Sequence, residues 1–538
     1  MMLLSVPRQD AIPGVDTRTA TLRAALDTLP YADAVGATQQ VLERLRDINH
    51  QILPGGHRYE LMQAFSEAYA RLHEGLRAGT AEGGPVVEQR HRLLAEFTEQ
   101  LLNGYKYIIN SSQDEKQRWG KPKHLVGAIN YSAHLILLLL AARYQEYLPT
   151  DERLWHEAIQ ISQFAADTGY PASPAADFPF APEGRLNATG SMTLAALLRL
   201  ADPYHLPPNA IWELLQYLCG HMTEISQRSE APEGEAVAGV LPLCISCDSD
   251  RAVRHQGKLH GEIAIALDVV ELLHSIQEDI GRLDASLPPA RIGFSRNLGR
   301  RDAVQLLNHL LKQYRLPPER RLVRVDAHEE TIEIGIGLET AFTLHNGGVP
   351  FNPMEYIDLQ DEEEIDIGYP LETLSACYRS KPKQIRCSCL NRSAGGMALH
   401  QAAGAEFPLK VGQLVVLPSG KNGGWLTGAV RWVVNHGDEG REAGIQYVAR
   451  DARPAAVRPL TGDVETRFLP ALTLRLQQGE SIYRILFGTR GLFHKDRLLE
   501  LEENDERRQI RCIRLLESNT NFERFIYEPV DEAPADQQ

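Results

Sequence analysis

The spacing of hydrophobic residues changes once along the chain, and the first part has the period of α-helices. Between about residue 17 and residue 315, apolar residues recur at steps of three and four, the spacing of one helix face. Segments rich in proline and glycine, such as Pro54-Gly55-Gly56, separate these stripes. We therefore expect a helical bundle or an irregular helical array. The expected helices cover residues 59–76, 94–108, 125–148, 155–166, 211–225 and 259–280.

From about residue 321 onward, apolar and polar residues alternate, which is the period of a β-strand. Short strands joined by glycine-rich turns are typical of an antiparallel barrel or sandwich. The strands expected before Pro459 cover residues 331–336, 386–390, 397–400, 414–417, 425–434 and 444–448. A third set of strands follows Pro459 and predicts a smaller β module. These strands cover residues 472–476, 482–487, 497–501, 509–516 and 522–527.

The patterns together predict a multidomain α+β chain, with an N-terminal all-α helical region, an antiparallel β-barrel and a small C-terminal β module. An acidic stretch around Asp361-Glu362-Glu363-Glu364 is too long for a hairpin loop, so we expect an insertion in the barrel. The expected bounds are 1–290 for the helical domain, 291–319 for a basic helix or linker, 320–460 for the barrel with its insertion at about 346–384, 461–530 for the small β module and 531–538 for a polar tail.

Composition narrows the functional classes. The 538 residues are 43% hydrophobic and 24% charged, as in an ordinary soluble protein. The net charge of -15 disfavours a nucleic-acid polymer as partner, because like charges repel. The N-terminus lacks the basic and apolar regions of a signal peptide, and the apolar run 135–142 is too short to predict a membrane span. With seven cysteines and no disulfide pattern, we expect a cytoplasmic protein without a membrane span.

One segment reverses the overall charge. Residues 291–324 hold nine lysines and arginines against two acidic residues, Asp302 and Glu319. Pro317-Pro318 ends the helical region, and Arg320, Arg321 and Arg324 follow just before the first strand. An arginine offers a planar fork of donors that fits phosphate oxygens or a guanine edge, and it stacks on base planes. Read alone, such a cluster is also typical of a solvated linker face.

A polar turn lies between the strand expected to end at Leu390 and the strand expected to start at Met397. In it, Asn391 and Ser393 have short side chains that bond neighbouring backbone groups. Gly396 can adopt a positive φ and let the backbone approach a ligand closely. Read alone, this turn is a plain hairpin. Together with the arginines and the barrel-like strands, it indicates a ligand site.

These residues together resemble the PilZ domain. The resemblance rests on an R-x-x-x-R arginine pair, a strand, a [D/N]-x-S-x-x-G turn, and later strands around residues 428–432 and 443–447. It covers roughly residues 318–460. It implies a small antiparallel β-barrel that binds the bacterial second messenger cyclic di-GMP. Arg320 and Arg324 match the arginine pair, with Arg321 as an adjacent cation. The matches in the turn are Asn391, Ser393 and Gly396.

The chain departs from the PilZ pattern at two points. Asn391 stands where the family more often has aspartate, which removes a charge but keeps an acceptor. The gap between Arg324 and Asn391 is also much longer than in simple members, because the acidic insertion lies within it. If this insertion covers the mouth of the barrel, ligand binding is blocked or regulated.

Other candidate chemistry is weaker. The pair Cys244-x-x-Cys247 lacks a second pair at zinc-site spacing. Two E-x-x-H pairs have the spacing of di-iron bundles but need further inward carboxylates. They are Glu88 with His91 and Glu271 with His274. We find no hydrolase, metalloprotease, P-loop or Rossmann motif. We therefore expect no enzyme, no cofactor and no metal.

Three functions remain open from the sequence. The first is a receptor that couples cyclic di-GMP binding at the barrel to an unknown protein partner of the helical region, in motility, attachment or biofilm control. The second is a scaffold or adaptor whose PilZ-like barrel no longer binds a ligand. The third and weakest is a metal-dependent enzyme built on the helical bundle.

Overall fold

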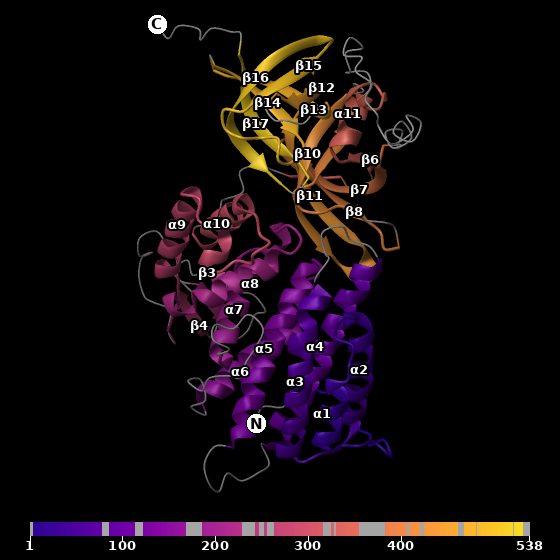
Figure 1. The fold of residues 1–538 in the computed structure, drawn as a ribbon, viewed down its shortest axis with the longest axis vertical. Coiled ribbons are helices and arrows are strands. Elements are labelled where there is room, and N and C mark those ends of the chain that lie inside the picture. Colours follow the sequence, from indigo (N-terminus) through magenta and orange to yellow (C-terminus); the bar gives the residue numbers. More distant parts are fainter. Residues whose placement is uncertain are drawn as a thin grey trace. The chain divides into compact units, whose positions relative to one another are not determined.

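The computed structural model describes residues 4–77, 85–112, 122–167, 186–228, 243–246, 252–254, 263–315, 324–327, 330–353, 382–404, 408–419, 424–460, 467–479, 481–519 and 521–530. The chain divides into two compact units, Met1–Glu319 and Arg320–Gln538. The first unit is mainly helical and the second is built from β-strands, so the change of period in the sequence marks the change of architecture (Figure 1).

The first unit is an array of α-helices whose apolar faces form one large core. Side-chain caps begin some of them: Asp33 accepts a hydrogen bond from the Gly36 amide at 3.1 Å, and Asn187 accepts one from the Gly190 amide at 2.7 Å. The helices are α1 (Thr19–Asp27), α2 (Ala34–His50), α3 (Gly55–Arg77), α4 (Pro85–Ser112), α5 (Lys123–Gln145), α6 (Glu152–Asp167), α7 (Ala188–Leu200), α8 (Ala210–Gly220), α9 (Val270–Asp284) and α10 (Arg300–Tyr314).

Helix α5 lies in the centre of this core. By length and composition it could cross a membrane, but 83% of its most apolar window is buried inside the unit. Helices α4, α6, α7 and α8 pack around it. Polar groups in α5 are also used internally: the side chain of Asn130 accepts a hydrogen bond from the Ala188 amide at 2.9 Å. The apolar run 135–142 therefore lies in a buried helix, within the range 125–148 expected to be helical.

A small β-sheet interrupts the helical unit, which the sequence did not predict. Its strands are β1 (Ser226–Arg228), β2 (Leu243–Ser246), β3 (Ala252–Arg254) and β4 (Ile263–Asp268), in the order β1-β4-β2-β3. The expected helix over residues 259–280 was therefore wrong at its start, since β4 precedes α9. A short apolar run fits a strand or a helix equally well, and pairing with β1 and β2 decides between them.

The middle part of the second unit is an antiparallel barrel. The strand order is β5-β7-β6-β9-β10-β11-β8, and an additional pairing of β7 with β8 closes the sheet. An unpredicted helix, α11 (Leu338–His345), packs against β6 and β9. The predicted acidic insertion, including Asp361-Glu362-Glu363-Glu364, lies outside the described residues. The strands are β5 (Val325–Asp326), β6 (Thr331–Ile336), β7 (Gln384–Ser393), β8 (Gly396–Gln401), β9 (Leu414–Pro418), β10 (Trp425–Asn435) and β11 (Arg441–Ala449).

The C-terminal part is a second closed barrel rather than an open module. Its order is β12-β13-β14-β17-β16-β15, with β12 (Arg453–Pro459), β13 (Leu469–Gln478), β14 (Ser481–Gly488), β15 (Leu498–Glu503), β16 (Glu506–Ser518) and β17 (Glu523–Pro529). The expected boundary at residue 460 is corrected, because β12 pairs with β13 and β15 and so belongs here. A shared apolar cluster that includes Ala429, Phe487 and Phe522 joins the two barrels.

Candidate ligand-binding site

The first predicted element of the site is the arginine segment, and the structure describes only its last member. Arg324 is exposed and stands directly before β5. In the ladder between β5 and β7, Val325 lies opposite Arg392 and Asp326 lies opposite Asn391. Continued by one residue, this register brings Arg324 alongside Ser393. Arg320 and Arg321 lie outside the described residues.

The second predicted element, the polar turn, is shorter than its sequence suggested. Strand β7 continues through Ser393 and β8 begins at Gly396, so only Ala394 and Gly395 form the turn. The Ser393 hydroxyl stabilises the turn, since it donates to the Gly396 carbonyl at 3.3 Å and accepts from the Gly395 amide at 3.4 Å. The predicted end of the strand at Leu390 is corrected, because β5 and β8 both pair with the residues that follow it.

Gly396 has a packing role that differs from the predicted one. A Cβ atom at this position would lie 2.1 Å from the backbone oxygen of Ile445 on β11. Gly396 does not have a positive φ, the backbone angle that favours glycine. The described glycines with a positive φ lie at other positions. The glycine is therefore required because β8 and β11 approach each other closely, and this approach fixes the position of the turn.

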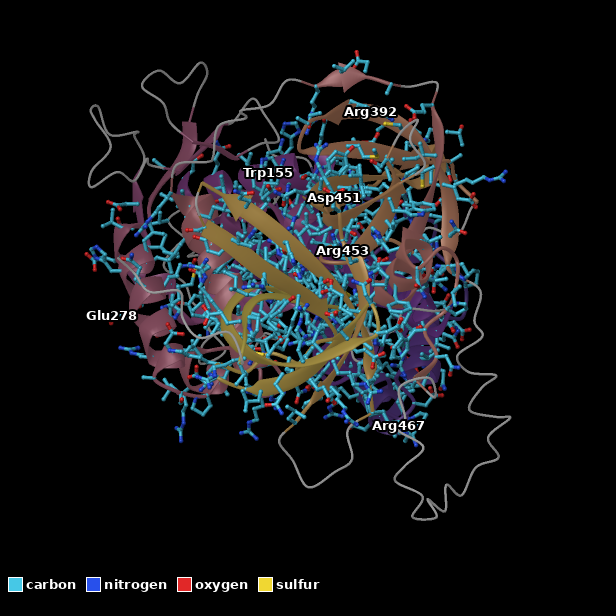
Figure 2. All side chains as sticks on the ribbon, turned by 90° about the horizontal axis from the view of Figure 1, so that it is seen from above. Trp155, Glu278, Arg392, Asp451, Arg453 and Arg467 are labelled. Atoms are coloured by element: carbon cyan, nitrogen blue, oxygen red, sulfur yellow. The ribbon has the colours of Figure 1, made fainter. Side chains whose placement is uncertain are left out.

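Three further residues surround the turn and were not singled out from the sequence. Arg450 donates to the Ala394 carbonyl at 3.1 Å, and the Tyr447 amide donates to the Gly395 carbonyl at 2.9 Å. Arg392 (labelled in Figure 2) forms an ion pair with Glu330. Arg392 occupies the variable position between Asn391 and Ser393, and no sequence signal marked it. The turn is thus held by β11 and bordered by two additional arginines.

The charge missing at Asn391 is present on the neighbouring strand. Asp326 lies directly opposite Asn391 in the β5–β7 ladder. The Cβ atoms of directly opposed residues in antiparallel strands are about 4.5–5.5 Å apart, so the Asp326 carboxylate and the Asn391 amide are neighbours. A carboxylate accepts hydrogen bonds from the N–H groups of a guanine edge, whereas an amide can both donate and accept. The pair therefore offers the range of contacts that a purine edge needs.

The competing metal and redox sites find no support in the described residues, which contain no group of three or more potential metal ligands. The side chains of Glu88, Glu271 and His274 are exposed, and His91 pairs with Glu146. Cys244 lies in β2, and Cys247 lies outside the described residues. Burial raises the pKa of the Cys387 thiol to about 11. A thiol with such a pKa is almost fully protonated at neutral pH and hence unreactive.

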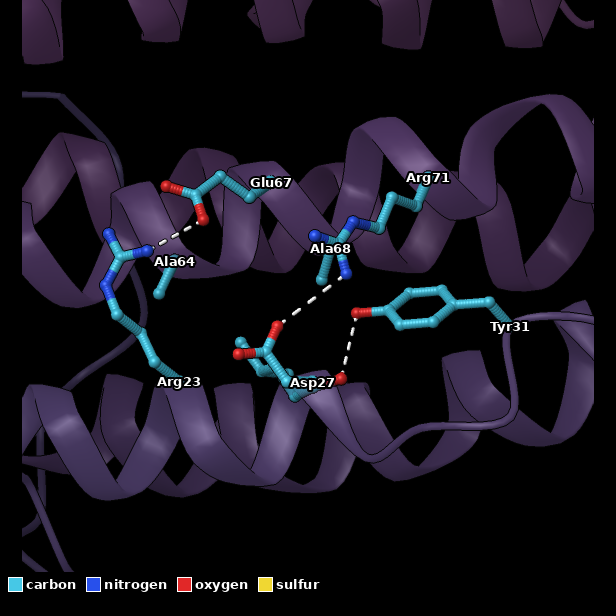
Figure 3. A pocket seen from close by; sticks show the side chains of 8 residues that line it. Arg23, Asp27, Tyr31, Ala64, Glu67, Ala68 and Arg71 are labelled. Carbon is cyan, nitrogen blue, oxygen red and sulfur yellow. Dashed lines mark hydrogen bonds and ion pairs between the residues drawn. The ribbon is translucent and has the colours of Figure 1, made fainter.

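A small pocket in the helical unit is closed by its own side chains. It lies between α1 and α3 (Figure 3). Arg23 contacts Glu67 at 2.7 Å, and Arg71 contacts Asp27 at 3.7 Å while lying over the ring of Tyr31. Each cation in this pocket has an anionic partner. We therefore interpret the pocket as a clamp between two helices.

Comparison with known proteins agrees with this architecture. Residues 20–227 match the family model described as the N-terminal domain of the cyclic-di-GMP receptor FimW, and residues 345–454 match the model of its middle PilZ domain. The cyclic-di-GMP receptor FimW of Pseudomonas aeruginosa is 22% identical over 579 residues, which cover 98% of this chain and 94% of that protein. No solved structure matches.

The middle barrel is a PilZ domain, which confirms the resemblance seen in the sequence. The chain belongs to the family of PilZ-domain cyclic di-GMP receptors that these two models describe. The match to the PilZ model includes Asn391, Ser393 and Gly396 but begins at residue 345. It therefore does not reach Arg324, whose place beside the turn rests on the β5–β7 ladder.

Proposed function

We propose that this protein is a receptor that binds cyclic di-GMP at the turn between β7 and β8. The ligand contacts would come from Arg320, Arg321, Arg324, Asn391, Ser393 and Gly396, the last through its backbone. The observation that carries the proposal is the β5–β7 ladder, which sets an exposed arginine beside the turn. Cyclic di-GMP carries two phosphates and two guanines, and arginine forks bind both. The receptor name of the P. aeruginosa relative supports the same ligand.

In this proposal Arg392 and Arg450 form the border of the site. Arg450 is held on the turn backbone through its bond to Ala394. Arg392 is held by Glu330, and its side chain is 42% exposed, so an anionic ligand can reach it. Two cations held beside the turn would act together with the arginine segment to attract the phosphates and orient the ligand, because charge-assisted hydrogen bonds are stronger than neutral ones.

The helical unit would be the output of the receptor and bind a protein partner. Its match to the FimW N-terminal model supports a role shared within the family. We further propose that the protein works in the cytoplasm, where cyclic di-GMP is made, and that it acts in motility, attachment or biofilm control. For the unit to respond, the ligand must bind two arrangements of the chain with different affinity.

The proposal is tested by calorimetric titration of cyclic di-GMP into the full-length protein and two variants. Arg324→Ala should weaken binding roughly 10-fold to 100-fold, the equivalent of one or two charge-assisted hydrogen bonds. The control is Arg386→Ala. Arg386 is an exposed arginine on β7, the strand that leads into the turn, but it lies opposite Glu333 and away from the turn. Its affinity should equal that of the wild type.

Two results would contradict the receptor proposal. Absence of binding heat in the wild type would favour the adaptor with a degenerate barrel. Equal affinity of the Arg324→Ala variant and the wild type for cyclic di-GMP would show that the ligand does not bind at the turn. Arg320→Ala and Arg321→Ala, measured alongside, show whether the rest of the arginine segment takes part.

A further inference from the structure

A segment near the start of the chain is held on the helical unit by hydrogen bonds to its backbone. Residues 4–12, which we call the N-terminal segment, belong to no helix or strand and contact α2 and α4. The Asn110 side chain of α4 bonds Leu4 in both directions. Its Oδ1 accepts from the Leu4 amide at 3.0 Å, and its Nδ2 donates to the Leu4 carbonyl at 2.9 Å. Asn110 thus satisfies both backbone groups of Leu4, as a neighbouring strand would do.

Two more donors of α4 bind the next carbonyls of the segment. Lys106 Nζ donates to the Ser5 carbonyl at 3.3 Å, and the Tyr107 hydroxyl donates to the Pro7 carbonyl at 2.8 Å. Lys106 and Tyr107 lie four and three positions before Asn110, so the three side chains share one face of the helix. All these bonds go to backbone atoms of the segment. This face therefore binds an extended chain through groups that every residue carries.

Two side chains of the segment add selectivity. Leu4 is 1% exposed and belongs to the apolar core of the helical unit. Gln9, five positions later, donates through Nε2 to the Asn49 carbonyl at 2.9 Å and to the Gln51 carbonyl at 2.7 Å. Both carbonyls lie at the C-terminal end of α2, where the last turn of a helix lacks intrahelical donors. The site therefore selects a leucine followed five positions later by a side-chain donor.

The N-terminal segment can leave this site while the helices stay packed. Among residues 4–12, Leu4 alone is buried, so release of the segment exposes little apolar surface. Segments with few buried apolar contacts open locally at low cost. Release would uncover Lys106 and Tyr107, which are 1% and 8% exposed, and leave their donors without the carbonyls that they now bind. Another extended chain would restore these bonds.

We propose that a protein partner docks on this face of α2 and α4 by placing an extended segment where residues 4–9 now lie. The partner segment would carry the same pattern, a leucine and a glutamine five positions later. The donors are held by α4, so the replacing chain finds its hydrogen bonds already oriented. The protein's own segment then acts as a tethered competitor, at an effective concentration on the order of millimolar. This inference rests on the proposed role of the helical unit as output and gives that output a site.

The probe is a fluorescent synthetic peptide with the sequence of residues 1–12, and its anisotropy measures binding to full-length proteins. The variant Leu4→Asp/Gln9→Ala releases its own segment and should bind the peptide at least 10-fold more tightly than the wild type does. Arg8→Ala is the matched control, because the Arg8 side chain is 89% exposed, and it should bind as weakly as the wild type. A peptide that carries Leu4→Asp and Gln9→Ala should not bind.

Two substitutions on α4 test the site itself in the released variant. Asn110→Ala removes both bonds to Leu4 and should weaken peptide binding about 10-fold. Tyr107→Phe removes only the hydroxyl and keeps the ring that lies against the Arg58 guanidinium, so its melting temperature should equal that of the released variant. It should weaken binding by a smaller factor. The peptide should also raise the melting temperature of the released variant more than that of the wild type.

The outcomes separate this inference from its alternatives. It is overturned if the released variant does not bind the peptide, if it binds no better than the wild type, or if Asn110→Ala has no effect on binding. A wild-type dimer in light scattering that the peptide dissociates would assign the site to a second copy of this chain and also overturn it. Cyclic di-GMP is titrated into the same variants. Cyclic di-GMP binding without peptide binding refutes only this inference, and the reverse result refutes only the receptor proposal.

Discussion

Arg431 on β10 and Glu517 on β16 form an ion pair that joins the PilZ barrel to the C-terminal barrel. The Arg431 Nη2 lies 3.1 Å from the Glu517 Oε2, and Nη1 contacts the other carboxylate oxygen. The same guanidinium donates through Nε to the Gln446 side chain at 2.8 Å. Gln446 is the partner of Gly396 in the β8–β11 ladder. A continuous set of contacts therefore runs from the candidate ligand turn to the second barrel.

The first prediction concerns this ion pair. Glu517→Gln should lower the free energy of unfolding by roughly 1–3 kcal/mol at neutral pH, since the hydrogen bonds of a largely buried carboxylate lose their charge. Burial alone would raise the pKa of Glu517, but the bonds and charge of Arg431 outweigh it and keep the pKa below its usual value. The stabilisation is thus fully present above about pH 4.5 and is lost as the pH falls through the lowered pKa.

Denaturant unfolding at several pH values checks this prediction. The difference between the wild type and Glu517→Gln should be largest near pH 7 and should shrink below pH 4. Glu528→Gln changes an exposed carboxylate on the adjacent strand β17 and serves as the control. A difference that stays constant down to acid pH would show that the charge of Glu517 contributes nothing.

The second prediction concerns Gly396. Gly396→Ala should destabilise the PilZ barrel by about 1–3 kcal/mol or more, because the new Cβ would meet the Ile445 backbone oxygen at 2.1 Å and backbone cannot move aside cheaply. Gly424→Ala is the matched control, since its Cβ would meet only the Ser419 Cβ at an ordinary 3.7 Å. Thermal melts of both variants decide the matter. Equal stability of Gly396→Ala and the wild type would show that the approach of β8 to β11 does not require a glycine at this position.

The third prediction concerns a buried histidine in the helical unit. His73 on α3 is 2% exposed and packs against the rings of Tyr69 and Trp212. Burial lowers its pKa from 6.5 to about 3. Below about pH 6.5 this histidine is protonated in the unfolded chain but stays neutral in the folded chain. The free energy of unfolding therefore falls as the pH falls through this range.

His73→Phe keeps an aromatic ring and removes the titration. Between pH 7 and pH 4.5 the wild type should lose about 1–3 kcal/mol more stability than the variant. His274→Gln, at an exposed position of α9, should follow the wild type. Parallel curves for the wild type and His73→Phe would mean that another group causes the acid sensitivity of the helical unit.

The fourth prediction concerns the buried ion pair between Lys106 on α4 and Glu157 on α6, which are 1% and 4% exposed. Lys106→Met alone should cost about 3–5 kcal/mol, because it leaves the Glu157 carboxylate buried without its cation. The double variant Lys106→Met/Glu157→Leu should recover most of this loss, because well-packed apolar side chains replace a buried pair at little cost. Urea unfolding of both variants measures the difference. A double variant no more stable than Lys106→Met would show that the pair itself, and not the orphaned charge, carries the energy.

Local patterns were sufficient to predict much of the fold. Hydrophobic spacing alone predicts the change of period near residue 321 and the barrel strands that follow this residue. It also predicts that α5 is a helix of the core. The PilZ resemblance followed from short motifs that survive in the sequence. The same local reasoning failed for β4, where the continuous apolar run 263–267 fits either a helix or a strand, and for α11, which lies inside a segment of mainly β character.

The sequence by itself determined which residue types are available, namely an arginine cluster, a polar turn and alternating apolar strands. Only the tertiary structure decided which of them meet. The register of β5 against β7 brings Asp326 opposite Asn391, and the pairing of β12 with β13 and β15 closes the C-terminal barrel. The close approach of β8 to β11, not a turn conformation, explains Gly396. The physical reason is the same each time: strand register depends on pairing between segments far apart in the chain, and local composition does not contain it.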